Sequence, residues 1–166
     1  MEKLINGTKI QTTGKKKIIG RALYWLRKAT EVSGEEEKFI YRWIALEALS
    51  GFSVTTSSAR RMLNDLLSCR LELDSANEVF ELDKETINIL GKSNIVGWRG
   101  RHPSINLANA IENKENCKVI LSRAVLCIYE VRNSLFHQGL VAELLNGCSS
   151  LLRDLNNSLI RDILSI

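Results

Sequence analysis

The amino-acid sequence predicts an all-α protein, an up-and-down bundle of about four to six helices in one domain, and three observations lead to this prediction. Apolar residues recur at steps of three and four along much of the 166-residue chain, which is the spacing of one helix face. Proline occurs once and aromatic residues make up 6% of the chain, a balance that favours helices over a strand-rich sandwich. Hydrophobic residues make up 45% and charged residues 25%, so a chain of this length can bury a core without disulfides or metals.

The first helix is expected over residues 17–33, where apolar side chains follow the helical spacing. Residues 1–16 contain Gly7 and Gly14, several lysines and little periodicity. They are predicted to form a flexible basic arm that precedes a helical domain over residues 17–166.

The second helix is expected over residues 35–50, where three glutamates suit the positive end of the helix dipole. It is apolar over most of its surface, which indicates a central position, and Gly51 is expected to end it. Either Ser57 or Ser58 can cap a third helix that runs to about Cys69.

The stretch from residue 70 to 114 gives the weakest pattern. It contains short helical pieces such as 84–90, followed by a turn-rich run over 91–103 that is predicted to be a loop. Two further helices are expected over 116–138 and 140–166, where the apolar spacing returns.

The sequence also argues against several classes of protein. No apolar run approaches the roughly 18 residues that cross a bilayer, and the N-terminus lacks the apolar core of a signal peptide, so a cytoplasmic protein with no membrane contact is expected. The cysteines are widely separated and form no CxxC pair, so neither a zinc site nor any other metal or cofactor is expected. These cysteines are Cys69, Cys117, Cys127 and Cys148.

Positive charge is concentrated near the N-terminus. The whole chain carries +4, yet the first 28 residues hold eight lysines and arginines against one glutamate, a net charge of +7. Such an end suits either a phosphate-binding edge or a solvated tail. Together with an arginine-rich loop near residue 100, it supplies the candidate RNA contacts. They are Lys15, Lys16, Lys17, Arg99 and Arg101.

The chemistry-bearing segment is Arg132-Asn133-Ser134-Leu135-Phe136-His137-Gln138-Gly139, near the end of a strongly apolar helix. Polar groups at such a place must be solvated, paired or functional. Histidine titrates near neutrality, so His137 is suited to move a proton, and Arg132 carries a permanent charge suited to a phosphate. The alternative for His137 is an interior histidine with satisfied hydrogen bonds and no catalytic role.

This segment resembles the R-N-x-x-x-H-x-G form of the active-site motif of HEPN-domain ribonucleases. A second stretch, Trp43-Ile44-Ala45-Leu46-Glu47-Ala48-Leu49, resembles a W-x-A-L-E-x-L run of the ApeA-like branch. The resemblance implies a HEPN-like helical domain and metal-independent RNA cleavage at a site shared by two protomers. The expected products are a 2′,3′-cyclic phosphate and a 5′-hydroxyl.

In this interpretation Arg132 and His137 are catalytic, Asn133 assists, and Ser134 and Glu47 are supporting residues. The carboxylate of Glu47 is expected either to brace an active-site arginine or to form an ordinary salt bridge with a residue such as Arg60 or Arg61.

The helical wheel places Asn133 and His137 about 40° apart, but Arg132 and His137 about 140° apart. Either the helix ends or bends there, or two copies of the motif complete each other in a homodimer.

The sequence departs from one part of the family at Gly139. HEPN toxins controlled by nucleotidyltransferase antitoxins commonly have a tyrosine two places after the histidine, so the glycine favours the ApeA-like or phage-defence type. We therefore expect a homodimeric RNA endonuclease of a prokaryotic defence or toxin system, with an antitoxin or defence-complex protein as a further partner. The alternatives are a non-catalytic HEPN-like module that dimerises or binds RNA or protein in a larger assembly, and an unrelated helical adaptor.

Overall fold

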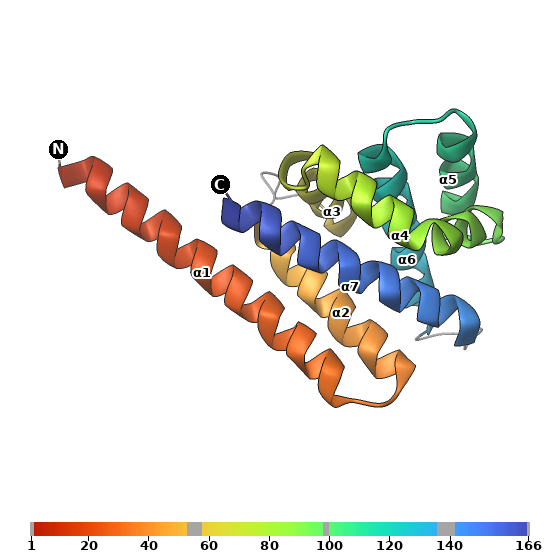
Figure 1. Cartoon of the computed structure of the whole chain (residues 1–166), viewed down its shortest axis with the longest axis horizontal. Coiled ribbons are helices and arrows are strands. Elements are labelled where there is room, and N and C mark those ends of the chain that lie inside the picture. The colour runs from red at the N-terminus through yellow and green to blue at the C-terminus, as the bar shows by residue number, and fades with distance from the viewer. Residues whose placement is uncertain (1, 53–57, 98–99, 136–141, 166) are drawn as a thin grey trace.

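The computed structural model describes residues 2–52, 58–97, 100–135 and 142–165 and confirms the all-α class over this part of the chain (Figure 1). It holds seven α-helices, more than the four to six expected, and a 3-10 turn over Ser50–Phe52. The helices are α1 (Glu2–Glu31), α2 (Glu35–Leu49), α3 (Ala59–Arg70), α4 (Leu73–Lys92), α5 (Pro103–Glu112), α6 (Cys117–Leu135) and α7 (Ala142–Ser165).

The first helix begins earlier than the predicted start at residue 17, because residues 2–16 continue α1. Lysine, glutamine and leucine are good helix formers, whereas Gly7 and Gly14 each cost only about 1 kcal/mol. Extending a helix that already exists is also far easier than starting one, and the segment from Lys17 onward provides that start. The N-terminal half of α1 projects beyond α2 in Figure 1.

The helix α2 lies between α1 and α7, as its apolar composition predicted (Figure 1). Its buried side chains include Phe39, Trp43 and Leu46, none of them more than 1% exposed. Polar bonds hold α7 against α2, since Asn156 donates from Nδ2 to the carbonyl of Arg42 at 3.0 Å. This packing joins α2 to the last helix of the chain.

The second half of the fold surrounds α6. Its neighbours are α3, α4 and α5, while α4 also packs along α7. The start of α4 is stabilised from another helix, because Asp162 of α7 accepts hydrogen bonds from the backbone N–H of Glu72 at 2.8 Å and from Ser75 Oγ at 2.7 Å. A carboxylate at this place satisfies backbone donors and complements the helix dipole.

The helices α4 and α5 occupy the stretch whose sequence pattern was weakest. The backbone of α4 is interrupted at Asp83, which has φ −110° and ψ 17°, and α5 has only ten residues, with Pro103 in its first turn. The predicted loop is therefore shorter than expected and begins after Lys92. No described helix is both long and apolar enough to cross a membrane.

Candidate functional site

The polar segment predicted to carry the chemistry begins in the last turn of α6. Arg132 and Asn133 are described with their side chains, and Ser134 is part of the same helix. His137 lies outside the described residues, as does Arg99. The geometry of the site therefore rests on the arginine, the asparagine and the groups that surround them.

Arg132 connects α6 to α2. Its Nη2 lies 3.9 Å from Oε1 of Glu47, and its Nη1 donates a hydrogen bond to Oδ1 of Asn133 at 3.0 Å. The two motifs singled out in the sequence therefore meet in the fold. Both side chains of the ion pair are part-exposed, at 35% and 41%, so the pair contributes less than about 1 kcal/mol to stability. Its main consequence is to orient the guanidinium.

A buried carboxylate continues the network. Asn133 donates from Nδ2 to Oε2 of Glu130 at 3.4 Å, and Glu130 is only 5% exposed. The amide of Asn133 thus links a cation on one side to an anion on the other. Sequence reasoning missed Glu130, although its position between two apolar residues of α6 was a usable signal.

The loop after α4 closes against this carboxylate. A Cβ placed on Gly97 would lie 2.7 Å from Oε1 of Glu130, so only glycine fits there without a shift. The N–H of Gly97 donates to the carbonyl of Arg101 at 2.7 Å, and Gly100 between them has φ +67°. The hydrogen bond from Gly97 therefore places the exposed Arg101 near the side of α6 on which Glu130 lies.

The predicted basic cluster of α1 lies next to a contact between α1 and the residues that follow α2. Ile18 of α1 lies against Gly51, where an added Cβ would be 3.1 Å from Ile18 Cδ1, and Gly51 follows Glu47 by four residues. Lys15, Lys16 and Lys17 precede Ile18 directly in α1, so this part of α1 lies beside the residues that follow α2.

The buried cysteines do not supply a nucleophile. Burial raises the pKa of the Cys127 thiol to about 12, with the carboxylate of Glu130 as the next cause, and burial likewise raises the pKa of Cys148 to about 12. Both thiols stay protonated at neutral pH, and a thiol reacts as its thiolate. Over the described residues no group of three or more His, Cys, Asp or Glu side chains is arranged to hold a metal ion.

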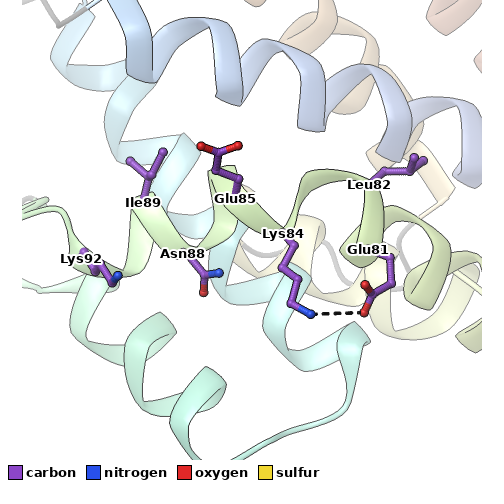
Figure 2. Close-up of a pocket in the computed structure, with 7 residues that line it drawn as sticks. All are labelled: Glu81, Leu82, Lys84, Glu85, Asn88, Ile89 and Lys92. Carbon is purple, nitrogen blue, oxygen red and sulfur yellow. Dashed lines mark ion pairs between the residues drawn. The ribbon is translucent and has the colours of Figure 1, made fainter.

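A shallow pocket of about 580 Å³ runs along α4 between Glu81 and Lys92 and shares no residue with the Arg132 network (Figure 2). Its charged side chains carry both signs, with Lys84 pairing with Glu81 at 3.7 Å. Side chains with mixed charge on one helix offer no convergent set of polar groups, which a specific ligand site needs. The pocket is therefore not assigned a function.

No family model, no curated protein and no solved structure matches this chain. The assignment of function therefore depends on the motif at the end of α6 and on the contacts around it.

Proposed function

We propose that this chain is a metal-independent RNA endonuclease of the HEPN type, acting as a homodimer in a prokaryotic defence or toxin system. The observation that carries the proposal is the R-N-x-x-x-H-x-G segment whose arginine is oriented by both Glu47 and Asn133. The arrangement suits phosphate chemistry, because contacts with its neighbours give the guanidinium a defined orientation.

The proposed reaction is an internal transfer within the RNA chain. The ribose 2′-oxygen attacks the neighbouring phosphorus and loses its proton to a histidine, while the bond from phosphorus to the 5′-oxygen breaks. That oxygen leaves with a proton from a second imidazole, so the products are a 2′,3′-cyclic phosphate and a 5′-hydroxyl. His137 from each protomer supplies these two roles. Arg132 stabilises the negative charge that builds on the phosphoryl oxygens.

The direction of Arg132 supports a site shared by two chains. Its guanidinium is directed to α2, and the helical wheel places residue 137 about 140° from residue 132 on a continuous helix. A twofold axis near the end of α6 would bring the arginine of one chain to the histidine of its partner.

The test is cleavage of an unstructured, end-labelled RNA in EDTA by the wild type and by His137→Ala and Arg132→Ala chains. We expect both variants to lose cleavage by about a thousandfold while their circular dichroism stays helical. The matched control is Arg123→Ala, an exposed arginine of the same helix about 180° from Arg132 on the wheel. Equal activity of His137→Ala and the wild type, or activity only with added metal, would refute the proposal.

A second candidate is a non-catalytic module that binds RNA or protein within a larger assembly. The observation that favours it is the partial neutralisation of Arg132, whose guanidinium is already engaged by Glu47 and Asn133. This candidate predicts RNA binding without any 2′,3′-cyclic phosphate product in the same assay.

A further inference from the structure

The outer face of α1 carries a row of cations and one aromatic ring. Lys17, Arg21, Tyr24 and Lys28 follow one another at steps of four, three and four residues, so they lie within an arc of about 60° on the helix. The opposite face holds Ile19, Ala22 and other apolar residues that are buried in the core. The row, here termed the α1 track, extends over about 16 Å of helix.

The N-terminal half of the α1 track holds free positive charge. Lys17 and Arg21 are exposed, and neither has a hydrogen bond or an ion pair with any described residue. Beside them, a Cβ placed on Gly20 would meet nothing within 4 Å, so the surface there is open. Farther along, Lys28 pairs with Glu31 at 2.7 Å, so positive charge is concentrated at the N-terminal end.

The aromatic ring of the α1 track, that of Tyr24, packs against a series of aromatic side chains. Tyr24 is 49% exposed and contacts Trp25 edge to face at a centroid distance of 5.2 Å. Trp25 in turn stacks on Tyr41 of α2 at 5.5 Å, and Nζ of Lys28 lies 6.0 Å from the Tyr24 centroid. An exposed ring fixed from behind and flanked by cations is the arrangement on which unpaired bases stack.

We propose that the α1 track binds single-stranded RNA, with phosphates on Lys17 and Arg21 and a base stacked on Tyr24. Lys17 and Arg21 lie about 6 Å apart along the helix axis, so successive phosphates of one strand can reach both. The ring requires an unstacked base, which a duplex does not offer. The choice of RNA over DNA rests on the proposed nuclease function, whereas the track itself does not.

The packing of α1 argues against a lipid surface as the partner. A helix that lies on a membrane turns its apolar face to the acyl chains. Along the α1 track the apolar face, which includes Ile19 and Ala22, is buried where α1 packs on α2, and the exposed face presents cations with Leu23 and Tyr24 as scattered apolar groups.

The experiment measures the fluorescence anisotropy of a labelled oligouridylate on full-length chain carrying His137→Ala, so that cleavage does not consume the probe. Adding Lys17→Gln and Arg21→Gln is expected to weaken binding about tenfold and to lower the slope of log affinity against log salt by about 1.4, since each phosphate contact on a single strand contributes about 0.7. Tyr24→Ala is expected to weaken binding about tenfold with no change in that slope.

Two matched variants separate these effects from general ones. Tyr24→Phe keeps the ring and is expected to bind like the parent, and Lys92→Gln removes an exposed lysine of α4 and is expected to have little effect. Circular dichroism of each variant excludes unfolding. Unchanged binding by the Lys17→Gln, Arg21→Gln and Tyr24→Ala chains overturns the proposal, as does binding to phosphatidylserine vesicles in place of RNA.

Different results would refute the RNA-binding proposal for the α1 track and the nuclease proposal. A chain that cleaves RNA while its α1 variants bind normally contradicts the track alone. A chain that binds RNA through α1 and yields no cyclic phosphate contradicts the nuclease alone.

Discussion

The guanidinium of Arg132 is held from two sides, by a carboxylate of α2 and by the amide of the next residue. The ion pair is weak, because both of its partners reach solvent. The two contacts instead set the direction of the guanidinium. This direction matters because a guanidinium contributes to catalysis only where its donors face the developing charge. Glu47 is accordingly a positioning residue in the proposed mechanism.

Replacing Glu47 by glutamine tests this role. We expect the rate constant for RNA cleavage to fall about fivefold, which corresponds to about 1 kcal/mol, because the side chain keeps its size but no longer attracts the guanidinium. The free energy of unfolding should change by less than about 1 kcal/mol. Glu37→Gln, an exposed glutamate in the first turn of the same helix, is the control and should cleave normally. An effect on the Michaelis constant alone would contradict a positioning role.

Gly97 and Glu130 provide a second test at the scale of single residues. Gly97→Ala requires the buried carboxylate of Glu130 to shift, and we expect it to lower the free energy of unfolding by about 1–3 kcal/mol. Gly14→Ala, with open space around its Cβ and a helical backbone, should raise it slightly. Combining Gly97→Ala with Glu130→Ala should cost less than the sum of the two single changes. Strict additivity in chemical denaturation would show that the two residues do not interact.

At the scale of elements, the residue at which the backbone of α4 is interrupted is a buried aspartate, Asp83. Asp83 is 5% exposed, and its Oδ2 has no hydrogen-bond partner. Burial raises the pKa of Asp83 from 3.8 to about 6, and the nearby carboxylate of Asp154 in α7 adds to the rise, while Arg153 opposes it. The contact between α4 and α7 therefore contains an aspartate whose neutral form is favoured more strongly than that of an exposed aspartate.

The stability of the α4–α7 contact should depend on pH. Because the folded-state pKa of Asp83 exceeds its unfolded value, the folded chain holds this proton longer, and this group lowers stability as pH rises from about 4 to 6. Asp83→Asn should raise the free energy of unfolding by about 1–3 kcal/mol at pH 7.5, with the gain fading towards pH 4. Urea unfolding across this range measures it, with exposed Asp74→Asn as the control. A gain independent of pH would rule out the charge as its cause.

At the scale of the whole molecule, the proposed mechanism requires two chains. An equal mixture of wild-type and His137→Ala chains should keep about a quarter of the cleavage of the same total amount of wild type, because only about a quarter of the dimers then hold both histidines. Sedimentation of differently tagged chains verifies the exchange. If mixed dimers form and about half of the cleavage remains, each chain acts alone and the shared site is refuted.

The described fold shows which helices could be predicted from the sequence alone. Helices α1, α2, α3, α6 and α7 were predicted because their apolar side chains repeat at the helical spacing over several turns. The spacing is interrupted in α4 by the buried Asp83, and α5 is too short to display it clearly. The start of the first helix was predicted too late in the chain, because scattered glycines were given more weight than the helix that follows them.

The sequence by itself determined the class of the fold and the residue types available for chemistry, because helical periodicity and side-chain reactivity are local properties. Only the tertiary structure decided that Glu47 meets Arg132, that Gly97 closes on Glu130, and that Tyr24 remains exposed between two cations of α1. Those relations join residues as far as 85 positions apart. They depend on how helices cross and pack, which no single segment of the chain specifies.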